Sequence, residues 1–168
     1  MRTLIAALFV ALAASGCATT IQARVLDAET KQPIQGAVVR GIWTKVAGVR
    51  GFTHRELVGV RATETDADGR FTLERLPSDG FEGEGDGQSI LVYKFGYVAW
   101  SNLIVFPSRG RREKQGVPKE IFLDLFPQSG SHFEHVLFID SLDSPRSGPS
   151  ILFPVLQRER DLANRERR

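Results

Sequence analysis

Short apolar runs alternate with turn-forming segments along residues 21–126. Within the runs, apolar residues recur at every second position, as at Phe71 and Leu73. This period is typical of a β-strand that buries one face, whereas the apolar face of a helix repeats every 3.6 residues. Since no helical period precedes the C-terminal tail, the pattern predicts an all-β sandwich.

Seven runs rich in β-branched and aromatic residues are expected to form the strands. They span residues 21–26, 37–45, 55–65, 70–75, 89–95, 98–106 and 119–126. Positions of period two within them predict a shared core of Val25, Val39, Phe71, Leu73, Leu91, Tyr93, Ile121, Leu123 and Leu125.

Two of the connections have side chains suited to tight turns. Asp27, followed by residues 28–30 and Pro33, can accept backbone N–H groups with its carboxylate. The pair Asp68 and Gly69 is a strong hairpin signal, because glycine adopts a positive φ at little cost.

Four motifs follow one another through the predicted sandwich: VLDAET at 25–30, PIQGAVV at 33–39, TDADGRF at 65–71 and KFGY at 94–97. Together they resemble the carboxypeptidase regulatory-like domain. The resemblance implies a seven-stranded Greek-key β-sandwich of the transthyretin-like (prealbumin-like) type over residues 21–126. Ala23 and Lys31 stand where glycine is frequent in that family, and residues 47–63 form a longer segment than usual. These motifs specify turns and core, so they are nearly silent about function.

Residues 1–16 have the pattern of a signal peptide: Arg2 precedes an apolar run over 4–14, which ends in two small residues. The run is shorter than the roughly 20 apolar residues that a membrane-spanning helix needs. The only cysteine, Cys17, follows directly, and residues 14–17 resemble the lipobox of bacterial lipoproteins. The resemblance implies cleavage before Cys17 and its lipidation. Ordinary secretion with a chance cysteine is the alternative.

Lipidation of Cys17 would anchor the protein to its membrane, because each buried methylene contributes about 0.8 kcal/mol. Ala18 resembles the residue that follows the cysteine in outer-membrane lipoproteins, since it is not aspartate. Residues 17–20 then form a short tether, in which 18–20 span about 10 to 14 Å when extended. The sandwich must therefore lie close to the membrane, and alternating strands would turn segments 46–54, 77–88 and 107–118 toward it.

The charges nearly balance, with 22 basic and 20 acidic residues, which gives no signal for nucleic acid. Locally they separate: Arg109, Arg111 and Arg112 crowd one loop, while residues 79–86 are acidic. The arginines are candidates for contact with anionic headgroups, where each basic residue contributes about 1 kcal/mol. Mutual neutralisation of the two loops is the interpretation that we favour.

Three segments contain potential metal ligands, and each has a simpler interpretation. Asp66 and Asp68 resemble the start of a calcium loop whose remainder is missing, so a hairpin turn is favoured. The carboxylates of 79–86 match no ligand spacing. His132 and His135 lie three residues apart rather than four, in a segment that looks like a loop entering a strand. We expect no metal and no other cofactor.

No motif in the chain indicates catalysis. Metallocarboxypeptidases place a glutamate three residues after a zinc-binding histidine, and no histidine here has that partner. The serines around Gly130 lack the strand, turn and helix that expose a nucleophile. We therefore expect a non-enzymatic module.

Two classes of function remain. A protein-interaction or structural module would bind another envelope protein through a sheet edge or through the tail. A carbohydrate-binding module would use Trp43 and Trp100, with Tyr93 and Tyr97, to stack on peptidoglycan or surface polysaccharide. The first is favoured, and burial of both tryptophans would remove the main basis for the second.

Residues 127–168 lie outside the family resemblance. Apolar runs at 136–139 and 151–156 are expected to add a strand or cover a sheet edge. The charged end, 157–168, predicts a frayed short helix or a disordered terminus, with partner docking as the alternative.

Overall fold

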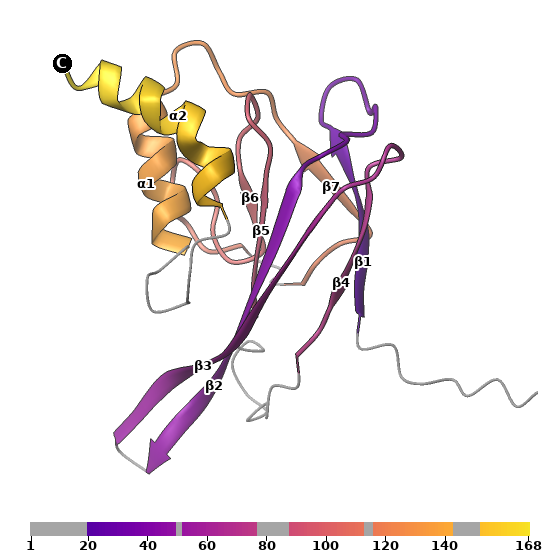
Figure 1. Cartoon of the computed structure of the whole chain (residues 1–168), viewed down its shortest axis with the longest axis vertical. Coiled ribbons are helices and arrows are strands. Elements are labelled where there is room, and N and C mark those ends of the chain that lie inside the picture. Colours follow the sequence, from indigo (N-terminus) through magenta and orange to yellow (C-terminus); the bar gives the residue numbers. More distant parts are fainter. Residues whose placement is uncertain (1–19, 50–51, 77–87, 113–115, 143–151) are drawn as a thin grey trace, which may run out of the picture.

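Two β-sheets pack face to face, and two helices cover the outer face of the larger sheet (Figure 1). The computed structural model describes residues 20–49, 52–76, 88–112, 116–142 and 152–168. The predicted signal peptide, Cys17 and the acidic segment 79–86 lie outside these ranges. No helix among the described residues is both long and apolar enough to cross a membrane.

The strands follow the sequence prediction closely in order and place. They are β1 (Thr20–Asp27), β2 (Val38–Val49), β3 (Phe52–Glu64), β4 (Arg70–Glu74), β5 (Gln88–Tyr93), β6 (Trp100–Ser101) and β7 (Glu120–Leu123). The helices are α1 (His132–Leu142) and α2 (Phe153–Glu166), so the chain is mostly β rather than all-β.

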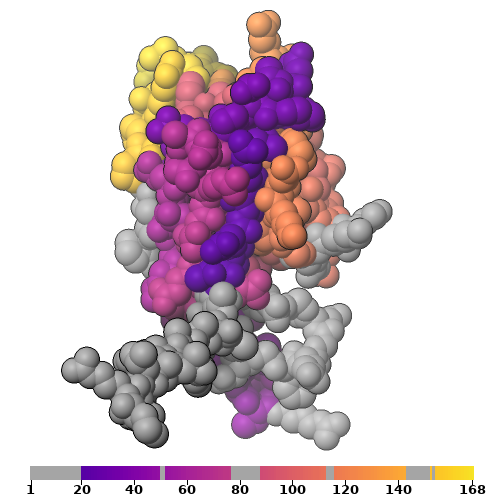
Figure 2. Space-filling view, turned by 90° about the vertical axis from the view of Figure 1, so that its right-hand side faces the viewer, coloured from indigo at the N-terminus to yellow at the C-terminus, as the bar shows by residue number. Residues whose placement is uncertain are grey.

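The smaller sheet has the order β4-β1-β7 and the larger sheet the order β3-β2-β5-β6. The pairs are antiparallel except β1 with β7, which is parallel and places Val25 opposite Ile121. In Figure 2 the three strands of the smaller sheet run side by side in indigo, magenta and orange. The N-terminal strand is thus at the centre of one layer.

The inner core lies between the two sheets. It contains Ile21, Ala23, Val25, Ile34, Ala37, Val39, Trp43, Phe71, Leu73, Ile90, Val92, Trp100, Ile121 and Leu123. Alternate residues of β1, β4, β5 and β7 enter it, which confirms the period-two interpretation for these strands. Three residues expected in this core lie elsewhere. Leu91 and Tyr93 face the other side of the larger sheet, and Leu125 is exposed, because β7 ends at Leu123 and the chain leaves the sheet.

Both predicted turns are formed, but the second does not close a hairpin. The Asp27 carboxylate accepts hydrogen bonds from the backbone N–H groups of Glu29 (2.9 Å) and Thr30 (2.7 Å). Gly69 has a φ of 72°, in the region that glycine tolerates best, and the Asp66 carboxylate accepts backbone N–H groups of the same turn. This turn connects β3 of the larger sheet to β4 of the smaller sheet, so the predicted hairpin is wrong.

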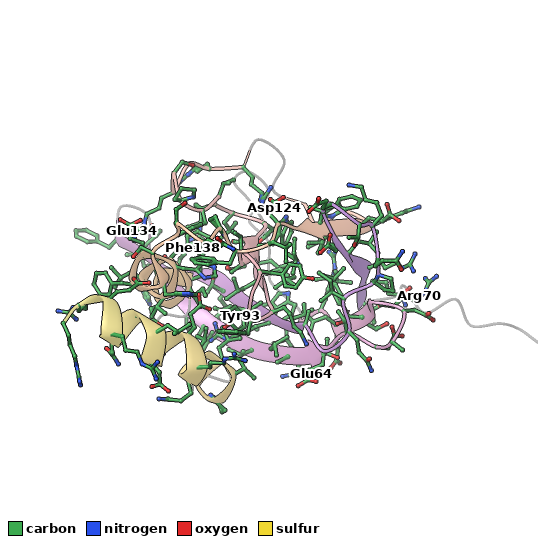
Figure 3. The ribbon with its side chains drawn as sticks, turned by 90° about the horizontal axis from the view of Figure 1, so that it is seen from above. Glu64, Arg70, Tyr93, Asp124, Glu134 and Phe138 are labelled. Carbon is green, nitrogen blue, oxygen red and sulfur yellow. The ribbon has the colours of Figure 1, made fainter. Side chains whose placement is uncertain are left out.

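An outer core lies between the larger sheet and the helices. The sheet contributes Val38, Leu91 and Tyr93. The helical side contributes Phe138, Ile139, Leu152 and Leu156. Figure 3 shows Tyr93 and Phe138 in this layer, between sheet and helix. The expected added strand at 136–139 is therefore wrong: this run is helical and packs on the sheet face.

The sixth strand is much shorter than the predicted 98–106. Its pairing with β5 ends at Asn102, whose backbone N–H still donates to the Ile90 carbonyl (3.1 Å). The Ile90 N–H donates instead to Oδ1 of the Asn102 side chain (2.7 Å), and Nδ2 donates to the Gln88 carbonyl (3.2 Å). The Ser101 hydroxyl then accepts the Leu103 N–H and bends the chain. Side-chain hydrogen bonds of this kind compete with strand pairing.

Candidate functional site

The long hairpin formed by β2 and β3 extends past the rest of the larger sheet (Figure 1). Its strands pair from Val38 opposite Glu64 to Val49 opposite Phe52, with a register shift after Trp43. Up to Trp43, β2 is buried; beyond it the strand emerges from the sandwich. We call residues 44–49 and 52–57 the hairpin arm.

Three large apolar side chains near the end of the hairpin arm are exposed. Val46, Val49 and Phe52 are 53%, 69% and 82% exposed, respectively. Large exposed side chains gathered at one place indicate an interaction surface more often than scattered ones do. Gly48 shapes this end: its φ is 109°, and a Cβ there would run into the Phe52 carbonyl oxygen.

Polar side chains flank the apolar end at the next positions along the arm. The Lys45 ammonium lies 3.5 Å from the Glu56 carboxylate, and Arg55 donates to the Thr44 hydroxyl (3.4 Å). Exposed ion pairs of this kind contribute little to stability. The arm is therefore held mainly by the backbone pairing of two strands.

The outer edge of the larger sheet is β3. Near the sandwich this strand runs close to β4, where Arg61 lies 3.4 Å from Glu74. Along the arm, from Phe52 to Leu57, no strand in the described part of the chain pairs with that edge. Unpaired N–H and C=O groups of a long edge strand form a template for pairing with another chain.

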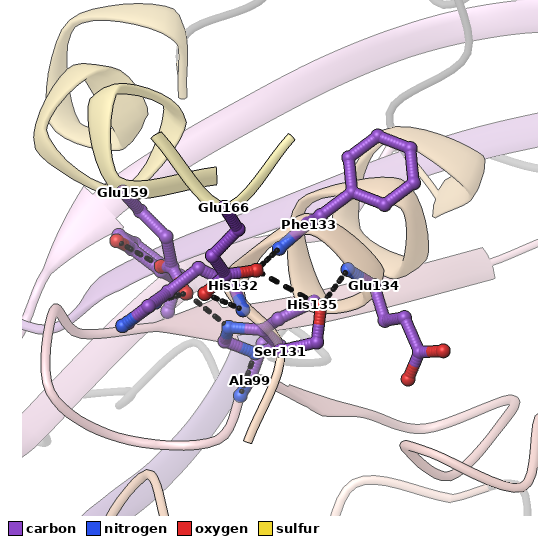
Figure 4. Close-up of polar contacts among 9 residues, drawn as sticks. Ala99, Ser131, His132, Phe133, Glu134, His135, Glu159 and Glu166 are labelled. Atoms are coloured by element: carbon purple, nitrogen blue, oxygen red, sulfur yellow. Dashed lines mark hydrogen bonds and ion pairs between the residues drawn. The ribbon is translucent and has the colours of Figure 1, made fainter. Parts of the chain in front are cut away.

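A second polar site is buried between the sheet and the helices and centres on Glu159 (Figure 4). Its carboxylate accepts hydrogen bonds from the Tyr93 hydroxyl (2.7 Å), His135 Nδ1 (2.5 Å) and His132 Nδ1 (3.2 Å). His135 Nε2 accepts the backbone N–H of Ala99 (2.9 Å). The cluster joins β5, the chain before β6, α1 and α2.

The pKa values follow from these contacts. Burial alone would raise the pKa of Glu159, but the hydrogen bonds from His135, Tyr93 and His132 outweigh it and hold the pKa below its usual value. Burial and the bond to Glu159 raise the pKa of Tyr93. Glu159 is thus kept ionised, and Tyr93 neutral, over the physiological range.

A second carboxylate of α2 caps α1. Glu166 accepts the backbone N–H groups of His132 (2.9 Å) and Phe133 (3.1 Å), and the Ser131 hydroxyl (3.0 Å). Desolvation opposes ionisation there, but these bonds outweigh it and lower the pKa of Glu166. Because the first N–H groups of a helix have no intrahelical acceptor, this contact fixes α1 against α2.

The histidine pair predicted as a weak zinc candidate therefore has another role. His132 and His135 lie on α1, not on a loop entering a strand, and both direct Nδ1 at one carboxylate oxygen. The remaining nitrogen of His135 is already hydrogen-bonded. Within the described residues no group of three or more ligating side chains could hold a metal ion.

Of the residues proposed for sugar stacking, Trp43, Trp100 and Tyr93 are buried and Tyr97 is half-buried. Trp43 and Trp100 are 1% and 7% exposed and pack in the inner core. The hydroxyls of Tyr93 and Tyr97 are each bonded to a carboxylate. Neither indole offers a face to a polysaccharide, so the sugar-stacking prediction is wrong at these positions.

The three arginines proposed for headgroup contact separate into two kinds. Arg109 and Arg111 are exposed. Arg112 turns inward: Nε donates to the Ser101 carbonyl (2.5 Å) and the guanidinium lies 5.0 Å from the Trp100 ring centroid. Burial lowers the pKa of Arg112. Arg112 is occupied by these contacts within the protein. Headgroup contact therefore remains a prediction for Arg109 and Arg111 alone.

No protein-family model and no curated protein matches the chain. Among solved structures it is similar in part to a streptococcal ancillary pilin (16% identity, TM-score 0.31) and to a 9R-lipoxygenase from Cyanothece (13% identity, TM-score 0.33). The matches cover 66% and 68% of this chain but only 30% and 18% of those proteins. The resemblance to the carboxypeptidase regulatory-like domain therefore stays a prediction.

Proposed function

We propose that this chain is an envelope lipoprotein, anchored to the outer membrane through Cys17, whose sandwich is a non-catalytic module that binds another envelope protein. The single observation that supports this function is the unpaired edge of β3 along the hairpin arm. The motifs at 25–39 and 65–71 support a sandwich of the carboxypeptidase regulatory-like type.

Strand addition is the mode of binding that this edge favours. A partner segment in extended conformation would pair with the backbone of Phe52–Leu57, and its alternate side chains would contact the two faces of the arm. The arm has no proline to block such pairing. Backbone hydrogen bonds would supply affinity, and the side chains beside them would supply specificity.

Carbohydrate binding is the weaker candidate. Its sequence basis was a pair of exposed indoles, and both are buried. Among the large apolar residues that the structure describes, Phe52 is the most exposed aromatic side chain. A single aromatic ring without a second ring beside it is a poor stacking platform for a sugar.

The test is site-specific photocrosslinking in intact cells. A photoreactive residue replaces Glu56 on β3 in one strain and Arg165 on α2 in a control strain; both native residues are exposed. We expect one discrete protein adduct from position 56 and none from position 165. Adducts from position 165 alone, or a polysaccharide adduct from position 56, would refute binding of a protein at this edge.

A further inference from the structure

Exposed apolar side chains stand near the end, or tip, of the hairpin arm, together with basic ones. Val49 and Phe52 are directly opposite each other in the β2–β3 register, so their side chains share a face. Val46 is directly opposite Arg55, and Arg50 lies between Val49 and Phe52 in the sequence. A mixture of apolar and basic side chains is typical of segments that lie at the surface of a membrane.

The tip lies at the pole where the N-terminal tether joins the sandwich. In Figure 1 the chain enters β1 from the same end toward which the hairpin arm projects. The opposite pole is formed by the turns that precede β2 and follow β3. There the Thr65 hydroxyl, just after β3, donates to the Ile34 carbonyl, which lies before β2. Thr20 is three residues after Cys17, a span of about 10 to 14 Å when extended.

The order of side chains along the arm also suits a membrane surface. Val49 and Phe52 stand at the end, Arg55 lies nearer the sandwich, opposite Val46, and Lys45 follows one residue further in. Basic residues at that level can meet the phosphates of anionic lipids while the apolar tip lies deeper.

We propose that Val46, Val49 and Phe52 form a second membrane contact, which inserts into the headgroup region of the bilayer that holds the Cys17 lipid. The inference rests on the proposed lipid anchor at Cys17. With two points of contact, the sandwich would stand in one orientation, and α1 and α2 would face away from the membrane.

The test reads the depth of the tip in the full lipidated protein. Once Cys17 carries lipid, a cysteine introduced as Thr53→Cys is the only free thiol and takes an environment-sensitive fluorophore. A matched label at Asn164→Cys, exposed near the end of α2, reports the opposite side of the protein. Both proteins are reconstituted into vesicles of phosphatidylethanolamine and phosphatidylglycerol.

We expect a blue-shifted emission at position 53, quenched by spin-labelled lipids, and neither effect at position 164. The added changes Val49→Ser and Phe52→Ser should abolish the shift at position 53 and leave the melting temperature unchanged, because both side chains are exposed.

The outcomes separate the two proposals. A lipidated protein whose label at position 53 is neither shifted nor quenched would overturn the tip contact while leaving the anchor intact. A shift that grows with protein concentration at constant lipid would assign the tip to a second copy of the chain and would overturn the contact as well. An unmodified Cys17, detected by mass, would refute the anchor and with it the orientation on which the contact depends.

Discussion

At the residue scale, Glu159 and its three donors hold the helices on the sheet. The carboxylate is buried, and each of its partners comes from a different position in the chain: Tyr93 from β5, and His132 and His135 from α1. Hydrogen bonds to a buried charged group are among the stronger ones, and a partner left without its acceptor bears the full cost of desolvation.

Replacing Glu159 should therefore destabilise the protein. The change Glu159→Gln keeps the shape but removes the charge, and we expect the free energy of unfolding to fall by about 2 kcal/mol. Urea unfolding followed by circular dichroism measures it. Asp161→Asn, on the exposed face of the same helix, is the control and should change stability by less than about 0.5 kcal/mol. Equal losses in both variants would contradict the role of Glu159.

The same residue predicts a dependence on pH. Because the fold lowers the pKa of Glu159 below its usual 4.5, the ionised form is favoured in the folded state. The ionised carboxylate contributes fully to the free energy of unfolding above pH 4.5. This contribution is lost as the pH falls through the lower pKa that Glu159 has in the folded state. Wild-type stability should thus decline more steeply below pH 4.5 than that of Glu159→Gln. Parallel pH profiles would argue against this coupling.

Gly41 on β2 tests the packing of the inner core. A Cβ there would collide with the Trp43 ring and lie 2.8 Å from Leu73 Cδ2. Because both neighbours are buried, Gly41→Ala should cost about 1–3 kcal/mol in thermal or urea unfolding. Gly116→Ala is the matched control, since a Cβ at that position meets nothing within 4 Å. An unchanged melting temperature for Gly41→Ala would show that the core can adjust.

At the scale of elements, sequence patterns identified the strands, missed α1 and indicated α2 only as a frayed short helix. Period two and turn residues such as Asp27 and Gly69 are local signals, so strands and turns could be predicted from them. The buried side of α2 combines Leu152, Leu156 and Ala163 with Glu159, all at helical spacing. The charged Glu159 interrupts the apolar stripe of α2, and His135 does the same on the buried side of α1. The stripes could not be recognised from the sequence, because the partners of these polar residues were unknown.

The end of the chain was expected to be a frayed short helix or a disordered terminus, and it forms the helix α2, which packs on the outer core. Leu156 is fully buried there, so Leu156→Ala should reduce the free energy of unfolding by about 2–5 kcal/mol. The neighbouring Val155→Ala removes an exposed side chain and should have a much smaller effect. If both variants unfold like the wild type, α2 does not belong to the cooperative unit.

The candidate surface could be predicted only in part. The length of the segment 47–63 was visible in the sequence, and it forms much of the hairpin arm. That Trp43 turns into the core while Val46, Val49 and Phe52 stand in solvent depends on where β2 leaves the sandwich. This point is set by packing of the two sheets, which a local pattern does not specify.

At the scale of the whole molecule, the protein has three layers, and the hairpin arm and the helices lie at different ends. The smaller sheet, the larger sheet and the helices share two cores, and the hairpin arm projects from the pole at which the chain enters β1 (Figure 1). A lipid on Cys17 would bring that pole to the membrane. The tip contact and the orientation depend on this modification, whereas binding of a protein partner rests on the unpaired edge of β3.

The most direct test of the account is the intact mass of the protein purified from the cell envelope, with fragmentation of its N-terminal peptide. We predict a mature chain that begins at Cys17 and carries acyl chains on that residue. A chain that keeps residues 1–16, or one that is cleaved but has a free thiol at Cys17, would contradict the claim that this sandwich is a membrane-anchored module.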